Sequence, residues 1–288
     1  MRRSKIVKID ISIIIPIYKG KKYLPKLKKM LKANYYYLKE NTMEIIFVND
    51  YPQEEISVDS FLSNTKVVLI NNEKNLGIHK SRVKGLENSN GDYIIFLDQD
   101  DEIEDTYLIK QLDMIKENDA DVIITNGFYM NSDGSKRKIY QTKKHLNCCK
   151  DIKCFINFTN PIISPGQTII KRESIPKEWK ECSIIENGAD DYYLWLLMKY
   201  YEKKFYVNSE LLYTHVYTGE NTSSQLEKMK KSTDEIINML KGKYSFFSLW
   251  KIKRRNMYYA NYSNKIFHKI CYFDVFISRK LYCLMYLV

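Results

Sequence analysis

Residues 91–101 read GDYIIFLDQDD, an apolar stretch that runs directly into a cluster of acids. The β-branched and aromatic residues of Tyr93–Leu97 predict a buried strand. Asp98 and Asp100, separated by one residue at the end of this strand, can approach one hard divalent cation together. Mg²⁺ and Mn²⁺ prefer such oxygen ligands. The alternative is a solvated acidic turn, in which Asp101 caps the helix that follows.

Similar apolar runs recur along the chain, and segments with helical spacing separate them. We predict strands over residues 11–18, 44–50, 66–71, 92–98, 121–125, 165–171 and 205–214. We predict helices over residues 23–31, 78–88, 106–117, 190–201 and 232–240, and a loop over 219–224. Strands that alternate with helices indicate right-handed βαβ units. The predicted fold class is therefore α/β, with a mainly parallel central sheet flanked by helices.

Two of the predicted strands end in an aspartate, at Asp50 and at Asp98. Ligands of open α/β sheets bind beyond the carboxyl ends of the strands. We therefore expect both carboxylates at the ligand site. For Val48–Pro52 a simple turn is the alternative, because Asn-Asp and Tyr-Pro favour turns.

The predicted helix over residues 78–88 carries three cations, Lys80, Arg82 and Lys84, after a turn at Gly77. Cations beside a metal and a diphosphate would neutralise the charge of a nucleotide. For Lys84, a place on the exposed face of the helix is the better explanation.

The composition narrows the classes of function. A formal net charge of +11 over 288 residues favours phosphates, nucleic acids or an anionic membrane as partners. None of the six cysteines forms a CxxC pair, so we expect neither a zinc site nor a disulfide framework, and reduced thiols in a cytoplasm. The apolar run Ile11–Ile17 is far shorter than the ~20 residues of a membrane span. No cleavage site follows it, so a buried strand is the simplest interpretation.

The last 48 residues, 241–288, differ from the rest. They hold ten Lys or Arg and one acid, Asp274, among Tyr, Phe and Trp. Apolar residues recur there at steps of three and four, which marks one helix face: Ile266, Ile270, Phe273, Ile277, Leu281, Leu284 and Val288. A helical subdomain packed on the catalytic domain and a contact with an anionic membrane surface both fit. Nucleic-acid binding is not expected, because no recognised motif is present.

Taken together, these motifs resemble the ordered motifs of family-2 glycosyltransferases over roughly residues 10–105. The matching segments are SIIIPIY at 12–18, EIIFVND at 44–50, Asn75-Leu-Gly with Ser81-Arg82, and residues 91–101. A weaker match continues at 188–195, GADDYYLW, which is similar to the Glu-Asp segment that opens a helix and supplies the catalytic base in that family.

The resemblance implies a GT-A fold. A nucleotide-sugar-binding half would cover residues 1–105, an acceptor-binding half of the same domain residues 106–225, and a helical, basic and aromatic extension residues 226–288. The implied reaction moves a sugar from a UDP-sugar to a hydroxyl of a glycan or lipid-linked acceptor, with inversion and with Mn²⁺ or Mg²⁺. Such an enzyme would serve cell-surface polysaccharide synthesis in the cytoplasm or at the inner face of the cell membrane.

The resemblance also assigns roles to residues. Asp191 would be the general base, with Asp190 in the position usually held by Glu. The donor would contact Pro16, Ile17, Tyr18, Asn49, Asp50, Lys80, Arg82, Asp98, Gln99 and Asp100. Asp100 would be the principal metal ligand, with Asp98 and His215 as further ligands. Counting back from Asn221 and Ser223 would place the family's histidine at Thr218 instead, so both positions stay open.

The chain departs from the family pattern at three places. Lys19 stands where Asn is common, Asn49-Asp-Tyr-Pro replaces Asp-Asp-Gly-Ser, and Val83 replaces a frequent Asn. The second of these changes leaves the ribose contacts open.

Two other classes of function remain. One is a catalytically silent module that binds sugar nucleotides or glycans through the same motifs. The other, a sugar-1-phosphate nucleotidyltransferase, is less favoured because the Gly-rich phosphate loop that it would need near the N-terminus is missing.

Overall fold

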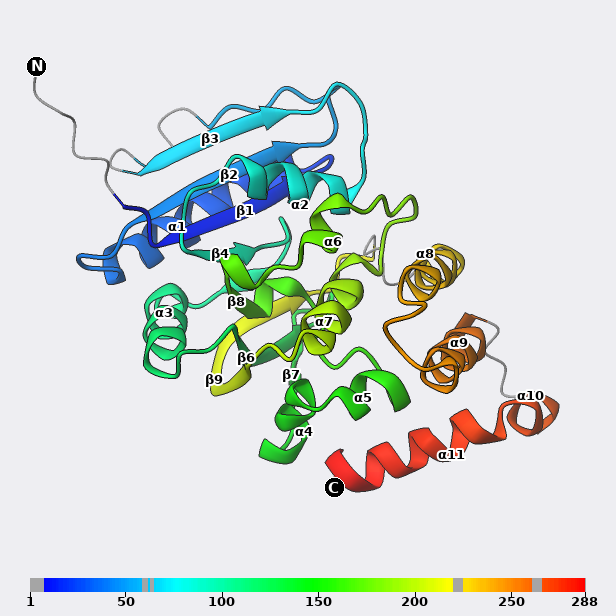
Figure 1. The fold of residues 1–288 in the computed structure, drawn as a ribbon. Coiled ribbons are helices and arrows are strands. Elements are labelled where there is room, and N and C mark those ends of the chain that lie inside the picture. Colours follow the sequence, from blue (N-terminus) through cyan, green and yellow to red (C-terminus); the bar gives the residue numbers. More distant parts are fainter. Residues whose placement is uncertain (1–7, 59–61, 63–64, 220–224, 261–265, 288) are drawn as a thin grey trace, which may run out of the picture.

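The computed structural model describes residues 8–58, 62, 65–219, 225–260 and 266–287. One twisted sheet forms the centre of the molecule, and helices pack around it (Figure 1). Its strands follow the order β3-β2-β1-β4-β8-β6-β9-β5, and β7 pairs with β6. The predicted loop at 219–224 lies outside the described residues except for Gly219.

The N-terminal half of the sheet is parallel throughout. It consists of β1 (Ile11–Ile17), β2 (Met43–Asn49), β3 (Lys66–Asn71) and β4 (Tyr93–Phe96), all close to the predicted ranges. Every residue of β1 and β2 is buried. Their continuous apolar sequence is therefore that of parallel strands covered on both faces, as predicted.

The second half of the sheet is mixed. β8 (Thr168–Lys171) runs antiparallel to both of its neighbours, β4 and β6 (Val122–Met130). β9 (Phe205–Val216) lies parallel to β6, while the short strands β5 (Glu102–Ile103) and β7 (Lys136–Lys138) are antiparallel to β9 and β6. The pairs β3-β2, β2-β1, β1-β4 and β6-β9 are thus parallel, and β8 links the two halves of the sheet through antiparallel pairs.

β6 extends five residues beyond the predicted end at Thr125. The register with β9 shifts on both sides of Asn126, which is a β-bulge. A Cβ on Gly127 would lie 2.0 Å from the carbonyl oxygen of Tyr213, so the close approach of the two strands requires glycine. The bulge carries β6 and β9 on towards the acidic cluster.

The helices have the following bounds: α1 Leu24–Tyr37, α2 Ile78–Glu87, α3 Tyr107–Glu117, α4 Lys143–Asn147, α5 Ile152–Asn157, α6 Lys177–Glu181, α7 Asp190–Tyr200, α8 Leu226–Met239, α9 Phe246–Ala260, α10 Ile266–Cys271 and α11 Phe273–Tyr282. Two of them are longer than predicted: α1 runs beyond Leu31, and α8 begins before Ser232. In α1, Asn34 donates to the carbonyl oxygens of Met30 and Glu104. In α8, Ser232 accepts from the backbone N–H of Ala189.

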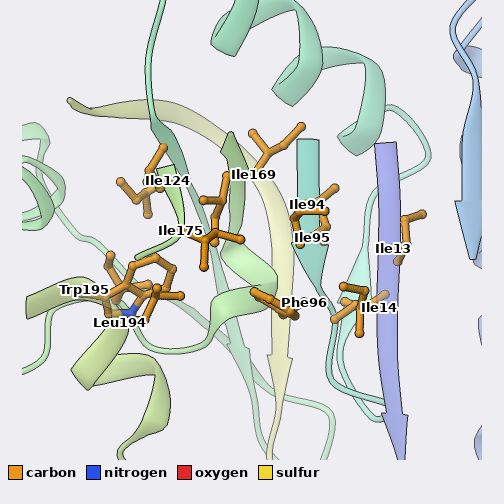
Figure 2. Packing of buried hydrophobic residues seen from close by; sticks show 14 of the residues in the cluster. Ile13, Ile14, Ile94, Ile95, Phe96, Ile124, Ile169, Ile175, Leu194 and Trp195 are labelled. Carbon is orange, nitrogen blue, oxygen red and sulfur yellow. The ribbon is translucent and has the colours of Figure 1, made fainter. Parts of the chain in front are cut away.

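The apolar core continues across the boundary at residue 105. Ile14 of β1 and Phe96 of β4 lie in one cluster with Ile124 of β6, Ile169 of β8 and Trp195 of α7 (Figure 2). Side chains from both halves therefore hold the site in place.

The helical C-terminal extension is present, but its apolar periodicity does not form one continuous helix. α10 ends at Cys271, and Tyr272 precedes α11 with a non-helical backbone, φ −119° and ψ 38°. A π-helical turn, Cys283–Leu287, follows α11. Among the described residues, no helix is both long and apolar enough to cross a bilayer.

Candidate active site

A buried arginine stands at the centre of the predicted site. Arg82 of α2 places Nη2 2.6 Å from Asp98 Oδ1 and Nη1 2.7 Å from Asp190 Oδ2. Its side chain is only 4% exposed. Burial alone would lower the pKa of Arg82, but the charges of Asp190 and Asp98 raise it, so the guanidinium stays charged. Arg82 thus ties the loop after β4 to the start of α7.

Asp101 does not cap the following helix, which corrects one sequence prediction. Its carboxylate is buried and accepts hydrogen bonds from the Tyr213 hydroxyl, the Ser164 hydroxyl (3.3 Å) and the Val216 N–H (3.0 Å). Nδ1 of His215 lies 3.0 Å from its Oδ1. The pairing of β5 with β9 brings this end of β9 over the acidic loop. Asp101 therefore holds the wall of the site together.

His215, one of the two positions open for the histidine, lies at the acidic cluster. Burial lowers the pKa of His215, but the hydrogen bond and charge of Asp101 outweigh it and raise the pKa. A carboxylate on Nδ1 fixes the orientation of the ring, as is common for metal-binding histidines. The edge of the ring faces Tyr129, with 6.0 Å between centroids.

The carboxylates of the loop after β4 suit a divalent cation. Burial, followed by the charges of Asp101 and Asp98, raises the pKa of Asp100 to about 7. Crowded negative charge of this kind is relieved by a metal ion. Among the described residues, no group of three or more His, Cys, Asp or Glu is arranged to hold a metal ion alone. Mg²⁺, however, is commonly held by one or two carboxylates together with substrate phosphates, so the residues fit such an ion.

Asp190 and Asp191 adjoin at the start of α7 but have different surroundings. The Asp190 carboxylate is paired with Arg82, and its carbonyl oxygen accepts from Trp179 Nε1 (2.8 Å). Asp191 accepts from Asn160 Nδ2 (3.2 Å) and lines a cavity. Burial, with a further contribution from Asp190, raises the pKa of Asp191 to about 7. Neighbouring acids whose environments differ in this way commonly divide acid–base roles.

Two cavities adjoin at Asn160, the hydrogen-bond partner of Asp191. The base cavity, about 180 Å³, is lined by Asp191 and by Ile252, Arg255, Asn256 and Tyr259 of α9. The tail cavity, about 310 Å³, is lined in part by Tyr129, His145, Tyr282 and Leu287. Thr159 and Asn160 line both cavities. The C-terminal extension therefore forms part of the walls of both cavities.

The predicted donor residues of β1 adjoin the acidic loop. Tyr18, just after Pro16 and Ile17, exchanges two hydrogen bonds of 3.0 Å with Gln99: its N–H donates to Oε1, and its carbonyl oxygen accepts from Nε2. The ring of Tyr18 is partly exposed and meets Tyr51 edge to face, with 5.3 Å between centroids. Tyr18, one of the predicted donor contacts, therefore belongs to an aromatic pair beside the acidic loop.

Asp50 is engaged within the protein. It accepts from Asn72 Nδ2 (2.8 Å) and from the backbone N–H groups of Leu76 (2.7 Å) and Gly77 (2.9 Å). Gly77 has φ +88°, a conformation that favours glycine. Asp50 thus anchors the turn before α2.

Two further predicted donor residues differ in exposure. The Asn49 amide is tied to the carbonyl oxygen of Glu54 (3.0 Å) and to the side chain of Asn71 (3.1 Å). Lys80, in contrast, is exposed on α2.

The sequence reasoning missed three residues of the site: Asn160, Ser164 and Tyr213. Ser164 carries a signal, because Ser-Pro-Gly-Gln matches a capping box, and the structure contains that box. The bond from Ser164 Oγ to Asp98 Oδ2, at 3.2 Å, leaves no such signal. Contacts across 66 residues arise only from the folded sheet.

Comparisons with known proteins agree with this geometry. The model of the family described as "Glycosyl transferase family 2" matches residues 12–179, more than half of the chain. The chain is 30% identical to the glycosyltransferase GlyG of Streptococcus pneumoniae over 130 residues, which cover 43% of this chain and 42% of GlyG. An uncharacterized glycosyltransferase of Methanocaldococcus jannaschii is 26% identical over 218 residues, 73% of this chain and 70% of that protein.

Among solved structures, S. aureus TarS 1–349 in complex with UDP-GlcNAc has a similar fold. Its TM-score is 0.64 at 17% identity, over 93% of this chain and 79% of that one. The aligned region spans less than two thirds of the length of several curated relatives. GlyA of Streptococcus pneumoniae, for example, is 30% identical over 129 residues, which cover 44% of this chain and 18% of GlyA.

Proposed function

Because the chain belongs to glycosyl transferase family 2 and has the GT-A fold, we propose that it is a metal-dependent, inverting glycosyltransferase. It moves a sugar from a nucleoside-diphosphate donor to a hydroxyl of a glycan or lipid-linked acceptor. The observation that carries the proposal is that Arg82 pairs with both Asp98 and Asp190, which joins the acidic loop to the start of α7, where Asp191 lies. A donor on the acidic loop and an acceptor in the base cavity would then lie next to each other.

The donor in this proposal is a UDP-sugar. The structural relative TarS was solved with UDP-GlcNAc and with UDP, which supports this class of donor. Tyr18 and Tyr51 would flank the base, with Pro16, Ile17, Asn49 and Asp50 nearby. Gln99 would keep the acidic loop beside them through its bonds to Tyr18.

Asp100 and Asp98, with His215, would hold Mn²⁺ or Mg²⁺ together with the donor diphosphate. When bound, the metal neutralises the negative charge that develops on the leaving diphosphate. Arg82 keeps Asp98 oriented through its ion pair. Lys80, exposed on the same helix, would contribute positive charge to the bound donor.

Asp191 is the general base in this proposal. It takes the proton from the acceptor hydroxyl, whose oxygen attacks the anomeric carbon from the face opposite the diphosphate, so the configuration inverts. Asn160 holds the Asp191 carboxylate in position. General-base assistance of this kind typically contributes about 10²–10⁴-fold in rate. Asp190 would act through Arg82, by fixing the start of α7.

We also propose the division of labour expected from the sequence. Residues 1–105 would bind the donor, residues 106–225 the acceptor, and residues 226–288 would form a basic extension that contacts an anionic membrane surface. A glycan or lipid-linked acceptor would fit cell-surface polysaccharide synthesis at the cytoplasmic side of the cell membrane.

A screen of UDP-sugars with and without Mn²⁺ tests the proposal. We expect UDP-GlcNAc or another UDP-sugar to raise the melting temperature, and its slow hydrolysis to release UDP only with the metal. Product analysis by NMR should show the inverted anomer. A protein that binds UDP-sugars but never releases UDP would be a silent binding module instead.

A further inference from the structure

The apolar periodicity of the C-terminal segment points away from the protein. Five apolar side chains here are between 38% and 68% exposed: Ile270 of α10, Phe273, Ile277 and Leu281 of α11, and Leu284 of the turn that follows. We call them the outer face. Residues at these spacings lie on one side of a helix. A helix that served only to cover the catalytic domain would turn this side inwards.

The opposite side of α11 is the one that packs on the domain. Val275 is buried there. The Tyr282 hydroxyl lies 2.8 Å from Nε2 of His145, and the carbonyl oxygen of Tyr286 accepts from the Thr142 hydroxyl at 2.8 Å. These contacts fix the rotation of the helix, so the outer face stays exposed.

The outer face continues onto α9. Phe247 and Trp250 are exposed and stack, with 5.6 Å between ring centroids. The guanidinium of Arg254 lies 5.5 Å from the centre of the Trp250 ring and 4.7 Å from that of Tyr272. Through Arg254, the aromatic pair of α9 adjoins the start of α11.

Basic residues outnumber acids ten to one over residues 241–288. The single acid among residues 241–288, Asp274, forms an ion pair with Arg254, Nη2 to Oδ1 at 2.6 Å. Lys253, Arg279 and Lys280 are exposed. Exposed apolar and aromatic residues beside exposed basic residues are typical of helices that lie in the interface of an anionic bilayer.

The geometry points to more than attachment: we propose that α10–α11 docks on an anionic bilayer by its outer face and so holds the acceptor cavities, which its inner side helps to line, close to the lipid headgroups. Tyr282, at the end of α11, and Leu287, in the turn after it, line the tail cavity. That cavity shares Thr159 and Asn160 with the base cavity. The acceptor is accordingly a saccharide whose lipid anchor stays in the bilayer. This inference rests on the proposed function and specifies its acceptor.

A bilayer fits this face better than a second copy of the chain does. Two copies joined through it would oppose surfaces of the same positive charge. An anionic lipid surface supplies the opposite charge and takes up Phe and Leu side chains at once.

Vesicle co-sedimentation of the full chain tests the proposal. The probes are vesicles of phosphatidylcholine alone and vesicles with about one third phosphatidylglycerol. We expect binding to the anionic vesicles only, weakening as salt rises from about 0.05 to 0.5 M. Phe273→Glu/Leu284→Glu should reduce this binding about tenfold or more, because two exposed apolar anchors are lost. Tyr36→Glu/Tyr37→Glu, which adds the same charge on exposed positions of α1, should bind like the wild type.

The proposal would be overturned if Phe273→Glu/Leu284→Glu bound the anionic vesicles as well as the wild type does. It would also be overturned if the wild type bound both kinds of vesicle equally. So would a wild-type dimer that Phe273→Glu/Leu284→Glu converts to monomer without any vesicle binding. UDP binding and UDP-sugar hydrolysis in solution need no bilayer. Their loss would refute the transferase, whereas their retention without vesicle binding refutes only the docking face.

Discussion

Arg82 and Asp190 form a buried ion pair, Nη1 to Oδ2 at 2.7 Å, although 108 residues separate them in the chain. The same guanidinium binds Asp98. One side chain therefore joins the acidic loop of the donor side to the helix that carries Asp191. In the proposed transferase, the distance between the donor and acceptor sites would depend on this bridge.

Arg82→Ala should destabilise the fold, because it leaves two carboxylates without their counter-charge, one of them almost fully buried. Removing one partner of a buried pair typically costs about 3–5 kcal/mol. Urea unfolding followed by circular dichroism would measure the loss. Lys80→Ala, an exposed cation on the same helix, is the matched control. A change as small as that of the control would show that the bridge contributes little.

Asp191→Asn should reduce UDP-sugar hydrolysis about 10²–10⁴-fold, because the amide cannot accept the proton. UDP affinity, measured by calorimetry, should stay within about twofold, because Asp191 belongs to the acceptor side. Asp113→Asn, an exposed acid of α3, serves as the control. An equal loss of UDP affinity would contradict the assignment of Asp191 as the base.

The pH dependence of kcat/KM should report the ionisation of Asp191. Burial raises its pKa from the usual 3.8 to about 7, so the carboxyl keeps its proton in mildly acidic solution. A general base acts only when ionised. With Mn²⁺ saturating, we expect kcat/KM to fall as the pH drops through about 7 and to level off above it. A profile that stays flat down to pH ~5 would disprove the expected shift.

Asp100→Ala should abolish the part of UDP affinity that depends on Mn²⁺, because a metal held jointly by carboxylate and diphosphate loses its protein ligand. Calorimetric titrations of UDP with and without Mn²⁺ would measure this difference. We expect a loss of about tenfold or more in the presence of the metal and little change in its absence. Affinity that is the same as in the wild type under both conditions would exclude Asp100 as a ligand.

Asp50→Ala should lower stability by about 1–3 kcal/mol even without a ligand. The N–H of Leu76 would lose its acceptor, and the buried amide of Asn72 and the N–H of Gly77 would each lose one of two acceptors. Denaturant unfolding of the unliganded protein measures the effect. If stability were unchanged and only UDP binding fell, Asp50 would be a donor contact rather than an anchor.

Much of the fold of residues 1–105 could be predicted from the sequence alone. β1 and β2 are continuous apolar runs because both of their faces are covered, and such runs are visible in any single sequence. Asp50 and Asp98 stand where two of these apolar runs end, so they too could be recognised from the sequence. Predictions failed where partners are remote. Asp101 was expected to cap a helix, but its partners Tyr213 and His215 follow more than 100 residues later.

The sequence by itself determined the α/β class, the order of the motifs and the periodicity of the C-terminal segment, because these depend on neighbouring residues. Only the tertiary structure decided which acids are paired, which one faces a cavity and which side of α11 is exposed. Burial and charge act through space, so Asp190 and Asp191, adjacent in the chain, differ because Arg82 binds one and Asn160 the other.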